Sequence, residues 1–196
     1  MKTKIILLIA ALLCSFIFSY AQSDSLRIKT FGLGVHVEQF KISDIGNNAE
    51  YFTPNKIILT FTFENHFRIE PEFGYRTATN NVSKNKESAL GLGIGIVGMF
   101  QHGRVSFPIG IQFKDDIFTE SSTNSSGNIN KITTTVFSAG PVVGAEYFLG
   151  DNFSVAGDIG LMFSSVSSKH DPAVSGQEID VSEFNTDTGL KLRFYF

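Results

Sequence analysis

The sequence predicts an all-β protein: a closed eight-stranded antiparallel up-and-down transmembrane β-barrel preceded by a cleaved signal peptide. Three observations lead to this prediction. A short apolar run follows two lysines at the N-terminus, apolar and polar residues alternate in eight later segments, and short connections alternate with long polar ones. Alternation with a period of two is produced by a strand whose two faces meet different surroundings.

The composition of the chain excludes several classes of protein. Its 20 Phe and 18 Gly outnumber the 16 Lys and Arg and 19 Asp and Glu. Glycine is the poorest ordinary helix former, so this mixture argues against a soluble helical protein. A net charge of -3 argues against a nucleic-acid partner, which requires a clustered basic surface. The single Cys excludes a disulfide framework.

Residues 1–21 are expected to be a signal peptide. Lys2 and Lys4 precede an apolar run over residues 5–18, and Ser19 and Ala21 supply small residues at the -3 and -1 positions of a cleavage site. As a helix, that run covers about 21 Å, which is short of the roughly 30 Å hydrocarbon core of a membrane. We expect cleavage after Ala21 and a mature barrel domain over residues 22–196.

The remaining sequence predicts eight strands, each about 9 to 11 residues long, which is the length that a tilted strand needs to cross a bilayer. They are expected over residues 31–38, 57–64, 67–76, 90–99, 105–114, 137–147, 153–163 and 187–196. Short connections at 65–66, 101–103 and 150–152 alternate with long polar ones at about 40–55, 77–88, 115–132 and 165–183. This alternation, on an even number of strands, is typical of bacterial outer-membrane barrels.

The two faces of the strands are assigned by the space available. The Phe, Ile and Leu face is too large to fit inside eight strands, so we expect it against lipid and the Gly-rich polar face in the lumen. A soluble lipocalin-like barrel, with the faces reversed, is the alternative. Aromatic girdles are expected near the short turns (Phe63, Phe67, Phe100, Tyr147, Phe148, Phe153, Phe194, Phe196) and near the long loops (Phe40, Tyr51, Phe52, Tyr75, Phe118, Phe163, Phe184).

Charged residues on the polar face predict a lumen filled by ion pairs, because buried charges persist only when they are paired. The predicted lumen charge network is Arg68, Glu70, Glu72, Arg76, Lys114, Glu146, Asp158, Asp187, Lys191 and Arg193. Structural filling is the favoured interpretation, and a narrow ion-conducting pore is the alternative. The sequence leaves open whether Pro71, Pro108 and Pro141 cause strand bulges.

No motif predicts a catalytic residue, a cofactor or a metal. The stretch over residues 93–98 matches the dinucleotide fingerprint, but it lies inside an expected strand rather than before a helix. The four histidines lack metal-ligand spacing. A lipid-modifying barrel enzyme is a further alternative, whose candidate residues are Ser164, Ser165, Ser167, Ser168, His170 and Asp171.

The C-terminal strand carries an expected assembly signal, made of Asp187, Gly189, Leu192, Phe194 and Phe196. With this signal, the chain resembles the outer membrane protein β-barrel domain family, whose members include barrels similar to OmpX, the membrane domain of OmpA and PorT-like proteins. In that family the signal often ends at the aromatic pair, whereas here Tyr195 and Phe196 extend beyond it. The resemblance implies insertion by the barrel assembly machinery, a monomer and no agreed catalytic activity. We also expect contact with outer-membrane lipids and a non-enzymatic role in which the long loops meet the exterior or an extracellular partner, as a structural element, an adhesin or a secretion accessory.

Overall fold

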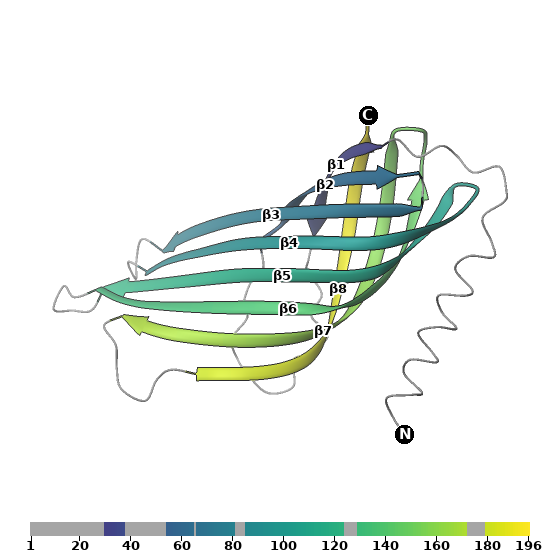
Figure 1. The fold of residues 1–196 in the computed structure, drawn as a ribbon. Coiled ribbons are helices and arrows are strands. Elements are labelled where there is room, and N and C mark those ends of the chain that lie inside the picture. The colour runs from purple at the N-terminus through teal and green to yellow at the C-terminus, as the bar shows by residue number, and fades with distance from the viewer. Residues whose placement is uncertain (1–29, 38–53, 65, 81–84, 124–128, 172–178) are drawn as a thin grey trace, which may run out of the picture.

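The computed structural model describes residues 30–37, 54–64, 66–80, 85–123, 129–171 and 179–196. Eight strands close into one antiparallel barrel in which neighbours in sequence are neighbours in space (Figure 1). They are β1 (Phe31–Val37), β2 (Lys56–Phe63), β3 (Phe67–Asn80), β4 (Asn85–His102), β5 (Val105–Thr123), β6 (Ile129–Phe148), β7 (Phe153–Asp171) and β8 (Ile179–Tyr195). No helix in the described part of the chain is long and apolar enough to span a membrane.

The barrel closes between its first and last strands, as the sequence predicts. Gly32 of β1 lies opposite Tyr195 of β8, and the ladder continues to Val37 opposite Leu190. This pairing removes the unpaired edges that β1 and β8 would otherwise expose to hydrocarbon, where no water is available for backbone hydrogen bonds.

The strands β4 to β8 are longer than the sequence predicts. They contain 17 to 20 residues each instead of about 9 to 11, and β3 contains 14. Much of the expected loops at 77–88, 115–132 and 165–183 is therefore strand. Backbone pairing continues beyond the bilayer, where the outward face meets polar surroundings and the alternation of apolar with polar residues ends. In Figure 1, β3 to β7 extend well past β1 and β2.

None of the three strand prolines introduces a bulge. Each removes a ladder donor, so pairing is interrupted on one side, but the register is the same before and after the interruption. Beside Pro71, for example, Ile58 lies opposite Glu72 and Phe61 lies opposite Ile69. Pro108 and Pro141 interrupt the β5–β6 and β6–β7 ladders in the same way.

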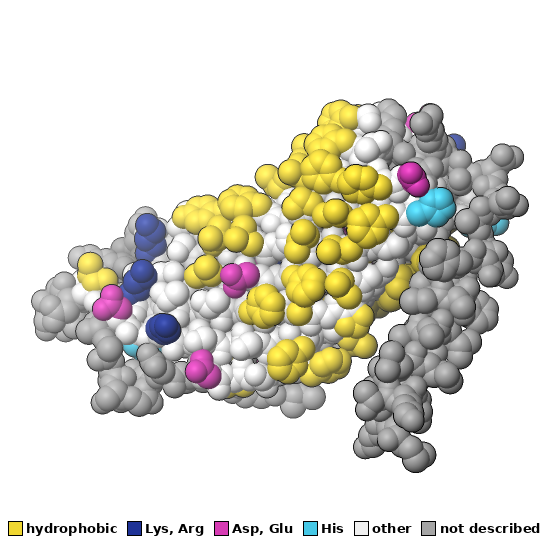
Figure 2. Space-filling model, viewed as in Figure 1, with side chains coloured by type: hydrophobic (Ala, Val, Ile, Leu, Met, Phe, Trp, Pro, Cys, Tyr) yellow, Lys and Arg dark blue, Asp and Glu magenta, His cyan; other side chains and the backbone are white. Residues whose placement is uncertain are grey.

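The distribution of side chains is reversed relative to a soluble protein. Large apolar residues such as Leu33, Ile109 and Leu161 are 42 to 45 % exposed, whereas Arg68 and Glu146 are fully buried. Figure 2 shows many of the apolar side chains as a broad yellow area on the visible outer face of the barrel, and we call this apolar part of the outer surface the apolar belt. Exposed apolar residues outside and buried charges inside are the arrangement of a membrane barrel, so the face assignment made from the sequence is correct.

Two of the expected girdle aromatics face the lumen instead. Phe148 and Phe118 are only 3 % and 8 % exposed, and each lies on the inward parity of its strand. Phe40, Tyr51 and Phe52 lie outside the described residues. Proximity to a turn or loop therefore does not place an aromatic ring at an interface unless its parity is also outward.

We expect Ile111→Arg to destabilise the barrel by about 2 to 4 kcal/mol, because this outward side chain lies in the middle of the apolar part of β5. Thr119→Arg, on the same strand and face but eight residues further out, is expected to cost less than about 1 kcal/mol. Denaturant unfolding of both variants in phospholipid vesicles measures the difference, and equal costs would contradict the position assigned to the bilayer.

Candidate functional site in the barrel lumen

A buried group of ion pairs fills the lumen near the short-turn end of the barrel. We define the lumen ion cluster as His36, Arg68, Glu70, Glu72, Glu146, Asp158, Lys191 and Arg193. These residues come from β1, β3, β6, β7 and β8, so the cluster connects opposite walls of the barrel. Alternate residues of a strand point to opposite faces of the sheet, and all of these residues lie at positions whose side chains point into the lumen.

Glu146 joins three walls of the barrel at the base of this cluster. One of its oxygens accepts from Arg68 at 2.7 Å, and the other accepts from Arg193 at 3.2 Å. The second oxygen also accepts from the hydroxyls of Ser154 at 2.5 Å and Tyr195 at 2.7 Å. Such charge-assisted bonds from two guanidinium groups are the arrangement that compensates a carboxylate for the loss of water.

Glu70 lies between the same two arginines and Lys191. Its Oε1 accepts from Arg193 Nη2 at 2.6 Å and from Arg68 Nη1 at 3.4 Å, and its Oε2 accepts from Lys191 Nζ at 3.3 Å. Glu70 and Glu146 therefore share both guanidinium groups. Because the two carboxylates share these groups, the positions of β3, β6 and β8 are fixed relative to one another.

Glu72 extends the cluster toward β1. Its Oε2 lies 3.0 Å from His36 Nδ1, and its Oε1 accepts from Gln112 at 3.2 Å. Lys191 lies 3.6 Å from Glu72 and 2.6 Å from Asp158. Since Asp158 is also 3.9 Å from His36 Nε2, the imidazole ring is held between two carboxylates.

Two separate ion pairs lie further toward the outer end of the lumen. Lys56 of β2 pairs with Asp116 of β5 at 3.0 Å, and Lys114 of β5 pairs with Asp187 of β8. Above them, Phe118 packs with Ala89 and Val136 against Val166. Charged and apolar side chains together line a pocket in this part of the lumen. Its empty volume is about 420 Å³, part of which is open solvent, and its lining includes Lys114, Asp116, Phe118, Val136, Met162 and Asp187.

An apolar floor closes the short-turn end. Val97, Met99, Val142, Phe148 and Tyr195 form one buried cluster beneath the charges. The Arg68 guanidinium lies 5.8 Å from the centre of the Tyr195 ring, while the Tyr195 hydroxyl reaches Glu146. Tyr195 therefore links the apolar floor to the ion pairs. Charged and apolar side chains both fill this end of the lumen.

Glycine makes room for the buried side chains where they meet the wall. A Cβ added at Gly189 would contact His36 Nε2 directly and lie 2.7 Å from Asp158 Oδ1. A Cβ added at Gly91 would lie 2.6 Å from both Asp116 Oδ1 and Lys56 Cε. Side chains of ion pairs thus rest against bare backbone, which only glycine provides in a barrel this narrow.

The structure places the predicted charge network in three groups. Seven of the predicted residues belong to the lumen ion cluster: Arg68, Glu70, Glu72, Glu146, Asp158, Lys191 and Arg193. Lys114 and Asp187 form their own pair further out. Arg76 is exposed on the outer part of β3, away from the cluster.

Sequence reasoning missed His36, Lys56, Asp116 and Tyr195 as partners in these ion pairs. His36 and Tyr195 had the inward parity but were not counted as part of the network. Lys56 lies just before the strand expected at 57–64, and Asp116 fell in an expected loop. Extending each strand by a few residues at the same parity would have found Lys56 and Asp116.

Four of the five residues of the expected assembly signal lie on β8, on both of its faces, and Phe196 directly follows the strand. Leu192, Phe194 and Phe196 are 39, 47 and 59 % exposed on the lipid side. Asp187 and Gly189 face the lumen, and Gly189 lies against His36.

Residues 93–98, which resemble a dinucleotide fingerprint, lie within β4 with no helix after them. No group of three metal-ligating side chains occurs among the described residues.

The comparisons with known proteins agree with this geometry. A family model described as outer membrane protein beta-barrel domain matches residues 8–194. The chain belongs to the outer membrane protein β-barrel domain family. It is therefore a protein of the bacterial outer membrane. No curated protein is significantly similar to the sequence.

A solved outer-membrane protein shares the fold of this family member at low identity. The major outer membrane protein of Thermus thermophilus is 12 % identical, with a TM-score of 0.51 over 85 % of this chain and 98 % of that one. Two others superpose less closely. Ail, the attachment invasion locus protein of Yersinia pestis, is 14 % identical, with a TM-score of 0.47 over 84 % and 95 %. CarO of Acinetobacter baumannii is 9 % identical, with a TM-score of 0.41 over 88 % and 100 %.

Glu146→Gln is expected to destabilise the barrel by about 3 to 5 kcal/mol, because it leaves two buried guanidinium groups facing a neutral amide. Glu120→Gln, at an exposed site on β5, is the control and is expected to change stability by less than about 0.5 kcal/mol. Equilibrium unfolding in detergent micelles compares them. A loss below about 1 kcal/mol for Glu146→Gln would show that the cluster contributes little.

Gly189→Ala is expected to cost about 1 to 3 kcal/mol, because its methyl group would displace the His36 ring. Gly157→Ala is the matched control on the neighbouring strand, since a Cβ there meets only Gly189 O at 3.9 Å. The loss of unfolding free energy caused by Gly189→Ala should be smaller in a His36→Ala background. An undiminished cost, measured by the same unfolding assay, would refute the contact with His36.

Proposed function

We propose that the protein is a non-enzymatic outer-membrane barrel whose lumen is closed and whose outer end takes part in interactions at the cell surface. The lumen ion cluster carries this proposal. Glu146 and Glu70 bind the same two arginines from opposite walls, and the apolar floor lies directly beneath them. An eight-stranded barrel is only wide enough for its own side chains, so such a cluster leaves no continuous water path.

A structural and interaction role is further supported by the length of the strands. β4 to β7 continue beyond the apolar belt and present an extended wall on the outer side of the membrane. Loops and strand ends on that side are where small barrels of this kind meet the exterior. In this proposal the barrel is a monomer, inserted by the barrel assembly machinery through the signal on β8.

The narrow ion-conducting pore is the second candidate. Alternating Arg, Lys and Glu side chains along the lumen are the observation that favours it, since charged residues line many ion pathways. The distances argue against an open path, because four contacts within the cluster are 3.0 Å or shorter. Conduction would require these pairs to separate.

The lipid-modifying enzyme has weak support from the placement of its candidate residues. Ser164 is buried and bonds to Ser138 at 2.8 Å and to Asn185 at 3.2 Å. His170 and Asp171 are adjacent on β7 and so lie on opposite faces of the sheet. Within the described ranges, the hydrogen-bond partners of Ser164 and Ser168 are other hydroxyls and an amide rather than a histidine. Mass spectrometry of lipid A with and without the gene tests this candidate, and an altered acyl pattern would support it.

We expect the purified protein, inserted into planar lipid bilayers, to show no conductance or only small conductance. The reason is the packed ion cluster, which must open before ions pass. Single-channel recording makes this measurement, with a porin of known conductance as the positive control. Large, stable openings would overturn the closed-lumen proposal.

A further inference from the structure

The outward face of the long strands changes character above the apolar belt. On β4 to β7 this face carries hydroxyl groups and three exposed lysines, Lys86, Lys131 and Lys169. The hydroxyls beside the lysines and between them and the belt are those of Ser88, Thr119, Ser121, Thr133, Thr135, Ser165 and Ser167. Figure 2 shows dark blue side chains at the far end of the strands, among white and a few magenta ones. We call this surface the outer lysine wall.

The register brings the three lysines close together. Lys86 and Lys131 both lie opposite Ser121 of β5, so their strands are two steps apart, or about 10 Å. Lys131 lies opposite Asp171, which places it diagonally across from Lys169 at about 7 to 8 Å. One phosphorylated headgroup can reach all three ammonium groups through their flexible side chains.

In the parts of the chain that the structure describes, Lys86, Lys131 and Lys169 make no ion pair. Asp171 is the carboxylate directly opposite one of them, and Asp180 lies further toward β8. The lumen side at the same height is acidic, since Glu87 and Glu120 lie opposite each other there. The outward face at this height therefore carries the three lysines together with Asp171 and Asp180, while the lumen face of β4 and β5 carries two opposed carboxylates.

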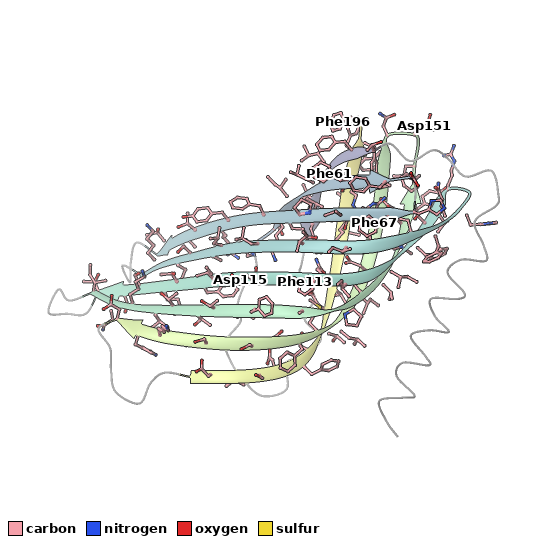
Figure 3. All side chains as sticks on the ribbon, viewed as in Figure 1. Phe61, Phe67, Phe113, Asp115, Asp151 and Phe196 are labelled. Carbon is pink, nitrogen blue, oxygen red and sulfur yellow. The ribbon has the colours of Figure 1, made fainter. Side chains whose placement is uncertain are left out.

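The height of the wall identifies what it meets. The large aromatic side chains of the apolar belt end at outward-facing Tyr75, Phe137 and Phe163, which are exposed. On β5 the outward face becomes mixed beyond Phe113, where Asp115 is followed by Ile117 (Figure 3). Aromatic rings mark the boundary between hydrocarbon and headgroups. The outward residues directly above this boundary lie among the lipid headgroups. Within a headgroup, phosphate is the chemical group that a lysine ammonium binds.

We propose that the outer lysine wall binds the phosphorylated saccharide headgroup of an outer-leaflet glycolipid of the lipid A type. Lys86, Lys131 and Lys169 bind its phosphates, and the Ser and Thr hydroxyls beneath them hydrogen-bond to the sugars. The lipid would lie along β4 to β7 with its acyl chains against the apolar belt. This site is independent of the lumen ion cluster, because it uses the outward face of β4 to β7 whereas the cluster lies inside the lumen.

The test uses the full chain refolded in zwitterionic detergent and titrated with lipid A that carries two phosphates, with binding followed by native mass spectrometry. Dephosphorylated lipid A is the second probe. Each lysine at a membrane surface contributes about fivefold to binding of an anionic lipid, so K86Q/K131Q/K169Q should weaken binding on the order of 100-fold. K86R/K131R/K169R, which keeps the charges, should bind as the unmodified chain does.

Asp171→Asn gives an independent readout that requires no loss of binding. Removing the carboxylate opposite Lys131 should strengthen binding of the phosphorylated probe about fivefold and leave the dephosphorylated probe unaffected. Equal binding of the two probes by the unmodified chain would overturn the proposal. So would equal binding of the phosphorylated probe by the glutamine and arginine variants, which would indicate recognition of the acyl chains alone.

Discussion

The requirement that every backbone group be hydrogen-bonded inside hydrocarbon determines the architecture of this protein. A strand edge cannot be left in lipid, so the ladder from β1 to β8 has to return to β1. Closure on eight strands sets a narrow radius, and the narrow radius decides what the lumen can hold. The lipid face, the glycine positions and the ion pairs all follow from that closed ladder.

A narrow lumen turns the polar face into the core of the molecule. In a soluble protein the core is apolar, but here the outside is apolar and the inside must be filled by the remaining residues. Arg68, Arg193 and Glu146 can be buried because each is surrounded by opposite charge. Buried ion pairs of this kind specify an arrangement more than they add stability, because pairing only offsets the cost of removing charges from water.

Beyond the bilayer the same strands obey a different rule. Their backbones remain paired, but their outward side chains no longer face hydrocarbon, so hydroxyls and lysines replace Phe and Ile. The wall of the barrel therefore has two chemically distinct zones along one set of strands. This division also explains the misjudged strand lengths, since polar residues at 77–80, 85–88, 115–123 and 129–132 have the composition of loops although they form ladders.

The sequence by itself determined the strand number, the parity of each face and the closed membrane barrel, because lipid imposes a strict period of two within the bilayer. It also indicated most of the inward charges, from Arg68 to Arg193. Only the tertiary structure decided which charges meet, that Phe118 and Phe148 turn inward, that His36 lies on Gly189, and that the prolines leave the register unchanged. These outcomes depend on the stagger between strands and on the width of the closed barrel, and neither is encoded in the pattern of a single strand.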